Sequence, residues 1–204
     1  MADQDALLAK QRAGGEHRHE MHKMQLTDLY TEFDTSKWGL TTDEAKKARV
    51  IHGLNNIPPP LSAPAWLCCL LPCLLQTKAM QEYHDAVPEY AMVMRNKKWL
   101  KMDAASIVPG DVIRVESGER VAADMRVIEA MGCSFETSYV HGGVNPLSCD
   151  PYTPGHQFLE SPNMAFLGYL CTSGQCTGVV IATGSSTVIA KLIDKKQWPP
   201  AGNL

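Results

Sequence analysis

VPGDVIRVESGERVAADMRVI, residues 108–128, is the stretch that decides the fold of this chain. Pro109-Gly110 combines a preset φ with a residue free to adopt a positive φ, so it predicts a turn. The next residues, Val112 to Glu116, alternate at period two, which is typical of a β-strand. Gly118 permits a second reversal, and Met125 to Ile128 is predicted to form another, half-buried strand. The stretch by itself predicts antiparallel β-structure.

The segments on either side of this stretch also have the pattern of strands. Tyr90 to Arg95 alternates, Asn96-Lys97 is typical of a turn, and Lys98 to Met102 is predicted to return as the partner strand of a hairpin. We expect three further elements, namely a strand at Ser134 to Ser138, a turn and apolar strand at Gly174 to Ala182, and a short helix at Val188 to Asp194. The fold is therefore predicted to be mainly β with short helices.

Residues 25–60 are predicted to form a small helical segment ahead of the β domain. Its first helix would begin near Met24, with Thr27 as the candidate cap. The second would begin at Thr41 to Glu44, which has the spacing of a capping box, and end at Gly53. The charged residues of this second helix are typical of a solvated face, so we expect its role to be structural.

Residues 1–24 are polar and are predicted to form a tail or an extended arm. His17, His19 and His22 lie close together in this stretch. A metal site needs deprotonated imidazoles held by a second layer of partners. Because the segment has no apparent core to hold them, we predict no metal site here.

Composition excludes several classes of function. The 204 residues carry a formal net charge of −3, and no basic stripe is interleaved with aromatic residues. Nucleic acid is therefore not expected as a partner. No glycine-rich phosphate-binding loop of the Walker type is present, and we predict no cofactor.

Seven cysteines are present, three of them crowded together and four scattered at Cys133, Cys149, Cys171 and Cys176. The amino terminus lacks the basic and apolar regions of a secretory signal. An odd number of cysteines without such a signal favours a reduced, cytoplasmic protein over a disulfide framework. Cys171 and Cys176 are predicted to flank a turn and to be buried thiols, with a hairpin pairing as the alternative.

Motifs spread along the chain resemble a known family. Residues 39–58 contain Gly-Leu-Thr and Gly-Leu-Asn-Asn-Ile-Pro, and residues 108–130 contain Val-Pro-Gly-Asp-Val, Gly-Glu-Arg-Val-Ala-Ala-Asp and Arg-Val-Ile-Glu-Ala. LESPNMAF at 159–166 and TGSST at 183–187 follow. In this order the motifs resemble the cytoplasmic regions of P-type cation-transporting ATPases, especially the sodium/potassium and proton/potassium pump branch. Ser186 and Ala190 depart from that branch, which carries Arg and Gly there.

This resemblance implies a distorted jelly-roll domain of the actuator type, preceded by the small helical segment. It divides the chain into a tail or arm (1–24), the helical segment (25–60), a proline- and cysteine-rich apolar linker (61–85), the actuator-like β domain (86–195) and a carboxy-terminal tail (196–204). In the pumps, two membrane-spanning helices occupy the place of the linker. The longest apolar run here is about half the roughly 20 residues that a spanning helix needs.

The linker contains Trp66 and three cysteines, Cys68, Cys69 and Cys73, within one short apolar run. Three interpretations remain open. The run is buried against the domain or a protein partner, because free cysteine behaves as a small hydrophobic residue. Alternatively, the cysteines are palmitoylated and anchor the protein to a membrane surface, or they form a metal or redox site. Trp66, together with Trp198 near the carboxy terminus, is also a candidate partner contact.

The family's catalytic feature is a Thr-Gly-Glu-Ser loop, whose carboxylate positions water against an aspartyl phosphate on another domain. A gapless alignment over residues 136–146 places His141, Gly142, Gly143 and Val144 at this loop. Gly143 stands in the place of the glutamate and has no group that can accept a proton. The sequence also contains no Asp-Lys-Thr-Gly phosphorylation motif. We therefore predict that the protein is not an enzyme.

Two functions fit these observations. The first is a non-catalytic remnant of an actuator domain, serving as a structural or assembly subunit of a larger cytoplasmic complex. The alternative is a regulator that acts in trans on a full-length P-type pump, anchored at the membrane surface if the linker cysteines are acylated. Both functions make other proteins the expected partners.

Overall fold

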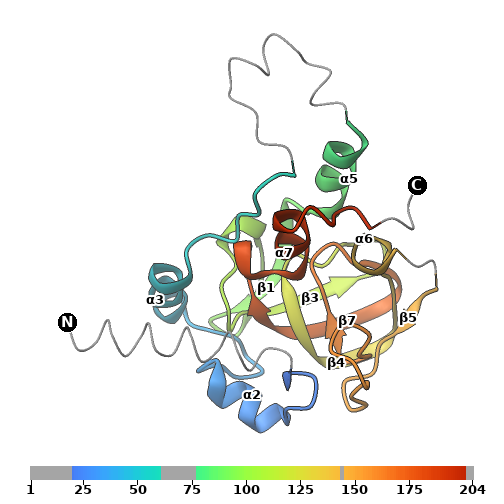
Figure 1. Ribbon diagram of the computed structural model, residues 1–204. Helices are drawn as coiled ribbons and strands as arrows, with labels where there is room; N and C mark the ends of the chain where they lie inside the picture. Colours follow the sequence, from blue (N-terminus) through green and yellow to red (C-terminus); the bar gives the residue numbers. More distant parts are fainter. Residues whose placement is uncertain (1–19, 61–76, 143–144, 201–204) are drawn as a thin grey trace.

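The computed structural model describes residues 20–60, 77–142 and 145–200. One twisted, seven-stranded sheet forms the body of the molecule, and short helices lie around its edges and ends (Figure 1). All strand pairs are antiparallel, in the order β2-β1-β3-β7-β4-β5, and β6 pairs with β4. The strands are β1 (Tyr90–Arg95), β2 (Lys98–Asp103), β3 (Val112–Glu116), β4 (Asp124–Glu136), β5 (Leu147–Ser148), β6 (Met164–Ala165) and β7 (Leu170–Ala182). The predicted β-rich fold with short helices is confirmed.

The deciding stretch forms β3 and β4, but these strands are not neighbours. Strand β7 lies between them and pairs with both. Close approach of β4 and β7 depends on Gly178, because a Cβ atom there would lie 2.7 Å from Met125 Sδ and 2.9 Å from the carbonyl oxygen of Arg126. Sequence alternation could not show this arrangement, because β7 follows more than 30 residues after β4.

The first half of β4 is buried on both faces rather than half-buried as predicted. Met125 and Val127 are completely buried on one side, and Arg126 on the other side is only 4% exposed. Arg126 is covered because the loop between β5 and β6 folds over it, and its Nη1 donates to the carbonyl oxygen of Pro151 at 3.1 Å.

The predicted hairpin of β1 and β2 is confirmed. Asn96 and Lys97 have φ values of 50° and 62°, so both turn residues are left-handed, as in the tight turns that suit twisted strands. The strand predicted at Ser134 to Ser138 differs from the structure. Ser134 belongs to the end of β4, whereas Ser138 begins a helix.

The predicted turn at Gly174 is also wrong, because β7 continues through it. Gly174 has φ 63° and Gly132 opposite has φ 61°, and the pairing register shifts between Met131 and Ser134. These glycines therefore produce an irregularity inside two long strands instead of a chain reversal. Cys171 and Cys176 consequently lie on one strand and do not face each other across a hairpin.

The helices are α2 (Leu26–Glu32), α3 (Thr42–His52), α5 (Lys78–Ala86), α6 (Ser138–His141) and α7 (Val188–Asp194), with 3-10 turns η3 (Ala104–Ser106) and η4 (Gly184–Ser186). The predicted capping box at α3 is present, with Thr41 as the cap and Gly53 at the end. Helix α2 begins one position after Gln25, so Thr27 lies inside the helix and does not cap it. No helix in the described ranges is long and apolar enough to cross a bilayer.

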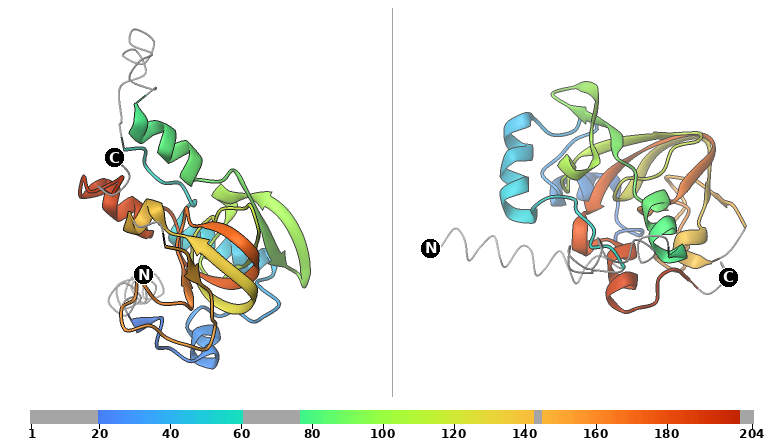
Figure 2. Two further views of the ribbon diagram at one scale, coloured as in Figure 1. Left: turned by 90° about the vertical axis from the view of Figure 1, so that its right-hand side faces the viewer. Right: turned by 90° about the horizontal axis from the view of Figure 1, so that it is seen from above.

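The helical segment packs directly onto the β domain, as the two views of Figure 2 also show. Leu29 and Ile57 are buried in the same core as the sheet. Asn55 is 5% exposed, and its Nδ2 donates to the carbonyl oxygens of Ala104 (3.0 Å) and Ala122 (2.9 Å). The two parts that the sequence separates therefore share one hydrophobic core.

The described end of the predicted tail or arm also contacts this body. Met21 is 1% exposed and His22 is 3% exposed. The carbonyl oxygen of His22 accepts a hydrogen bond of 2.8 Å from Nδ2 of Asn163. The chain is therefore ordered against the β domain before α2 begins. Residues 1–19, with His17 and His19, lie outside the described residues.

Candidate functional site

The loop that would carry catalysis leaves the sheet at the end of β4. The strand ends at Glu136, and helix α6 (Ser138–His141) follows after one residue. Gly142 has φ 67°, which is the left-handed conformation that commonly ends a helix. Gly143 and Val144, the next residues of the predicted loop, lie outside the described residues.

His141 is the only loop residue described here that has a side chain able to exchange a proton. Its Nε2 lies 2.8 Å from the hydroxyl oxygen of Tyr169 and 2.9 Å from the carbonyl oxygen of Leu159. Tyr169 is completely buried, and this burial raises the pKa of its phenol well above the ordinary value of 10. The phenol is therefore neutral, and Nε2 of His141 is already occupied by contacts within the fold.

Trp198, predicted as a partner contact, packs against its own chain. It is 7% exposed, and its Nε1 donates to the carbonyl oxygen of Tyr139 at 3.0 Å. The rings of Tyr139 and Tyr83 lie 6.2 Å and 6.5 Å from it, centroid to centroid. Its contact with a partner stays a prediction, and little of its surface remains exposed for that purpose.

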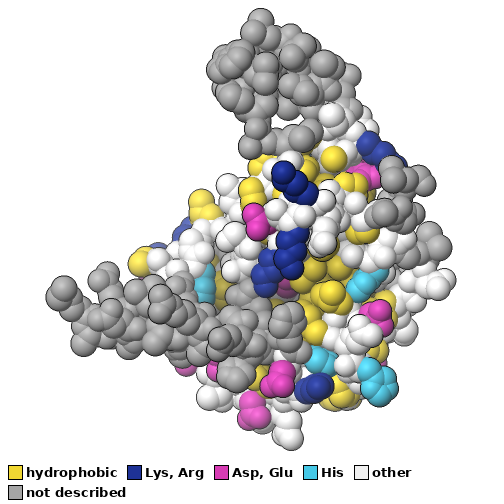
Figure 3. Space-filling view, viewed as in Figure 1, with side chains coloured by type: hydrophobic (Ala, Val, Ile, Leu, Met, Phe, Trp, Pro, Cys, Tyr) yellow, Lys and Arg dark blue, Asp and Glu magenta, His cyan; other side chains and the backbone are white. Residues whose placement is uncertain are grey.

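The other predicted attachment residues cannot be placed. Trp66, Cys68, Cys69 and Cys73 lie in the range 61–76, outside the described residues. Their burial, acylation or partner contact therefore stays a prediction. Figure 3 shows one face of the molecule, on which charges of both signs are interspersed and form no continuous basic stripe among the described residues.

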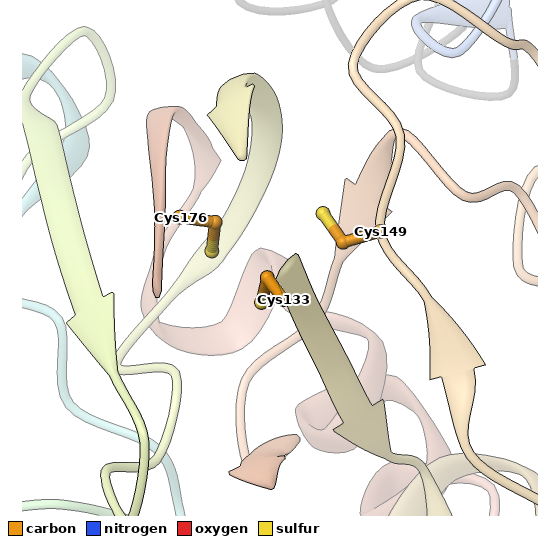
Figure 4. A group of neighbouring side chains, drawn as sticks. All are labelled: Cys133, Cys149 and Cys176. Carbon is orange, nitrogen blue, oxygen red and sulfur yellow. The ribbon is translucent and has the colours of Figure 1, made fainter. Parts of the chain in front are cut away.

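A group of thiols that sequence analysis treats as scattered comes together in the structure. The Sγ atoms of Cys133, Cys149 and Cys176 all lie within 4.8 Å of one another (Figure 4). Cys133 and Cys176 are buried, on β4 and β7, whereas Cys149 directly follows β5 and is half-buried. Cys171 lies next to the group, with its Sγ 3.7 Å from Cys133 Sγ.

The thiols of this group affect each other's protonation. Hydrogen bonds from Cys133 and Cys176 lower the pKa of the Cys149 thiol to about 5. The same contacts raise the pKa of the Cys176 thiol, because its hydrogen bond stabilises the thiolate of Cys149 only while Cys176 keeps its proton. Burial raises the pKa of Cys171 to about 12. The contacts within the group therefore favour ionisation of Cys149 over ionisation of Cys176.

A buried cation lies close to Cys149. Arg126 is 4% exposed, and its burial lowers the pKa of the guanidinium to about 10, while the charge of Cys149 acts in the opposite direction. Among the described residues no carboxylate forms an ion pair with Arg126. Its Nη1 donates to backbone carbonyl oxygens, the shortest contact being 2.6 Å to Val127. A negative charge on Cys149 favours the charged form of Arg126.

This group cannot be recognised from the sequence, because its cysteines form no local motif. Metal and redox sites are usually recognised from cysteines two to four positions apart, and these have no such spacing. The group forms through long-range pairing. The amide of Cys149 donates to the carbonyl oxygen of Cys133 at 2.9 Å, and Cys176 is paired with Ala130 across β4 and β7.

Comparison with known families decides what the surrounding fold is. Residues 85–197 match the model of the P-type ATPase actuator domain. The chain belongs to the P-type ATPase actuator domain family. Residues 21–71 match the model of the cation transporter/ATPase N-terminus, so the helical segment and the β domain each have a counterpart in P-type ATPases.

One similar solved structure is the crystal structure of a zinc-transporting PIB-type ATPase in the E2.Pi state. It is 22% identical to the actuator-domain chain, with a TM-score of 0.44. The match covers 56% of this chain and 17% of that ATPase chain. The chain therefore spans only a small part of the length of the ATPase that it resembles.

Proposed function

We propose that this actuator-domain protein is a non-catalytic remnant that serves as a structural or assembly subunit of a larger complex. The proposal includes descent from the sodium/potassium and proton/potassium branch of the P-type ATPases, which the motifs of residues 108–130 resemble. The observation that carries the proposal is the replacement of the loop glutamate by Gly143, in a chain whose fold-forming motifs are retained. Loss of a general base typically lowers a rate by about 10²- to 10⁴-fold.

The surroundings of His141 support the same proposal. A substitute base acting through Nε2 would need that nitrogen free to accept a proton from water bound at the loop. Nε2 of His141 instead contacts Tyr169 and Leu159 at 2.8 and 2.9 Å. Through Nε2 the histidine joins α6 to the segments before and after β6.

The test of the assembly role is the size of the native particle. The tagged full-length protein, expressed at its natural level, is separated by size-exclusion chromatography from both soluble and detergent extracts. We expect it to elute well above the size of the free 22.4 kDa chain, with partners at fixed stoichiometry after chemical crosslinking. Elution as a free monomer from both extracts would contradict the proposal.

The loss of catalysis is tested by adding the protein to a phosphorylated P-type pump and measuring the rate at which the pump is dephosphorylated. We expect no acceleration by the protein and none by the variant Gly143→Glu. Acceleration by the unmodified protein that disappears in His141→Ala would instead identify a working base and overturn the non-catalytic assignment.

The second candidate function is regulation of a complete pump in trans. It is favoured because both pump-like segments are retained and share one core. The regulator should change pump turnover when it is added in excess. Unchanged turnover at protein concentrations far above those of the pump would exclude this function, while leaving the assembly role intact.

A further inference from the structure

The three thiols of Cys133, Cys149 and Cys176 form the strongest unassigned site in the described part of the chain. Cys133 and Cys176 lie on β4 and β7, Cys149 directly follows β5, and the three side chains lie close together (Figure 4). Three sulfur atoms that all lie within 4.8 Å of one another are close enough for a single ion to contact all of them. Two of the three thiols are carried by long strands of the sheet, which is a rigid support.

We propose that Cys133, Cys149 and Cys176 bind a thiophilic cation with a filled d shell, Zn²⁺ or Cu⁺. Soft thiolate ligands select these ions over magnesium, calcium or manganese. A zinc–sulfur bond of about 2.3 Å places tetrahedral sulfur ligands about 3.8 Å apart. The thiols therefore need to approach by only about 1 Å, which small side-chain rotations supply without moving the strands.

The backbone holds two of the ligands in register. The hydrogen bond from the amide of Cys149 to the carbonyl oxygen of Cys133 is 2.9 Å long. Cys176 is fixed by its position in β7, the central strand, which pairs with β3 on one side and β4 on the other. Because the strands already determine these positions, binding requires little ordering of the chain.

The local charge also suits a thiolate-bound cation. Three thiolates around Zn²⁺ carry a net charge of −1, and the buried Arg126 beside Cys149 supplies +1. With Cu⁺ the thiolate group is more negative, and Arg126 offsets part of the excess. A buried charge is tolerated when it is paired in this way.

Burial and access are compatible with binding. Cys133 and Cys176 are 1% and 2% exposed, so water is largely excluded from the ion. Cys149 is half-buried and provides the route by which an ion reaches the other two thiols. Binding forms three metal–sulfur bonds and releases to solvent the protons of those thiols that were not already ionised.

Cys171 provides a matched control. Its Sγ is close to Cys133, at 3.7 Å, but it lies outside the mutually close group. Its thiol instead donates to the carbonyl oxygen of Ser173 at 3.2 Å. We therefore expect Cys171 not to be a ligand, although it is a buried cysteine of the same region.

The experiment uses the full chain purified with reductant and without oxygen, carrying Cys68→Ser, Cys69→Ser and Cys73→Ser so that other thiols cannot contribute. Zn²⁺ binding is measured by competition with a chromophoric chelator, and Co²⁺ reports thiolate ligation by its charge-transfer absorption. Cu⁺ binding is measured separately against a Cu⁺-specific chelator. We expect one bound ion per chain in the Zn²⁺ measurement, in the Cu⁺ measurement or in both.

Substitution of single cysteines tests which thiols bind the ion. Cys149→Ser, the substitution least disruptive to the core, should weaken binding at least about tenfold and remove the Co²⁺–thiolate absorption. Cys171→Ser should leave both unchanged, and circular dichroism should show both variants folded. Cys149→Ala gives the same comparison without the serine hydroxyl as a substitute ligand.

Three results would overturn the proposal. The first is a folded protein that binds neither Zn²⁺ nor Cu⁺ stoichiometrically. The second is an equal loss of metal affinity in Cys171→Ser and Cys149→Ser. The third is a disulfide between two of the three cysteines that persists in reductant. The proposal does not rest on the assembly role, because metal binding is measured on the isolated chain.

Discussion

Asp111, the acidic residue of the turn before β3, is completely buried, and both of its carboxylate oxygens accept hydrogen bonds. Arg95 donates to them from Nε at 2.9 Å and from Nη2 at 2.7 Å, and the amide of Val108 donates at 2.9 Å. Nη2 of Arg95 also donates to the carbonyl oxygen of Ser106 at 3.0 Å. This forked arrangement joins β1 to the turn and satisfies a buried charge pair.

Removing one member of this pair should be costly. Asp111→Ala leaves the buried guanidinium of Arg95 without its counter-charge, so we expect a loss of about 3–5 kcal/mol in the free energy of unfolding. Urea unfolding followed by circular dichroism measures it. Asp43→Ala is the control, because the Asp43–Lys46 pair is exposed and should cost less than about 1 kcal/mol. Similar losses in the two variants would contradict the prediction.

At the scale of single elements, the sequence predicts those features that depend on contacts between residues close together in the chain. The capping box of α3 is recognisable because Thr41 and Glu44 contact each other. The pairing of β7 with β3 and β4 is not recognisable, because alternation tells which face is buried but not which strand is the neighbour. The thiol group belongs to this second kind, since its members meet only after the strands have paired.

The cap of α3 should make a pH-dependent contribution to stability. Hydrogen bonds from the amide and hydroxyl of Thr41 hold the pKa of the Glu44 carboxyl below its ordinary value of 4.5. The contribution is therefore complete above pH 4.5 and is lost as the pH falls through the lowered pKa of the folded state. Glu44→Gln keeps an acceptor but cannot titrate.

Unfolding experiments at pH 6 and pH 3 check this prediction. The wild-type protein should be slightly more stable than Glu44→Gln at pH 6, and the difference should shrink at pH 3. Thr41→Ala should cost about 1 kcal/mol at pH 6, because it removes the side-chain cap. A difference between wild type and Glu44→Gln that grows toward pH 3 would show the opposite linkage.

The irregularity between β4 and β7 gives a second prediction for single elements. Gly132 and Gly174 have nearly equal φ values, 61° and 63°, but different surroundings. A Cβ atom at Gly174 would lie 2.2 Å from the carbonyl oxygen of Met131, whereas one at Gly132 would have nothing within 4 Å. Gly132→Ala should therefore cost only the left-handed strain of about 1–2 kcal/mol.

Gly174→Ala adds a backbone clash to the same strain, so its loss should exceed that of Gly132→Ala by at least about 1 kcal/mol. Thermal unfolding of the two variants side by side measures the difference. Equal melting temperatures would mean that β4 and β7 move apart readily at this point and so relieve the clash.

For the whole molecule, the helical segment and the β domain should unfold together because they share a core. Besides donating twice through Nδ2, Asn55 accepts through Oδ1 a hydrogen bond of 2.8 Å from the amide of Gly184. Asn55→Ala leaves buried backbone groups of η3, η4 and the segment before β4 without their partner. We expect a loss of about 2–4 kcal/mol.

The corresponding measurement is urea unfolding followed by two probes, tryptophan fluorescence and far-ultraviolet circular dichroism. The two curves should coincide in the wild-type protein and shift together in Asn55→Ala, as expected for one cooperative unit. Separate transitions would show that the helical segment unfolds independently. Thr31→Ala is the control, because Thr31 is exposed and its hydroxyl donates to the carbonyl oxygen of Thr27 within α2.

The general fold could be predicted because motifs such as residues 108–128 are long and ordered along the chain. The position of Trp198 could not be predicted, because a single aromatic residue in a proline-rich segment can contact either a partner or the core of its own chain. The loop chemistry was accessible in part, since the absence of a carboxylate at Gly143 is a property of the sequence, whereas the contacts of His141 depend on folding.

The hydroxyl of Tyr83 donates to the carbonyl oxygen of Ile57 at 2.6 Å and so joins the two sides of the 58–77 connection. Loop closure depends only weakly on length, at about 0.6 kcal/mol per doubling. A change in the length of the chain between these points should therefore cost the core little stability. The same position offers protein engineers a place to introduce a reporter domain.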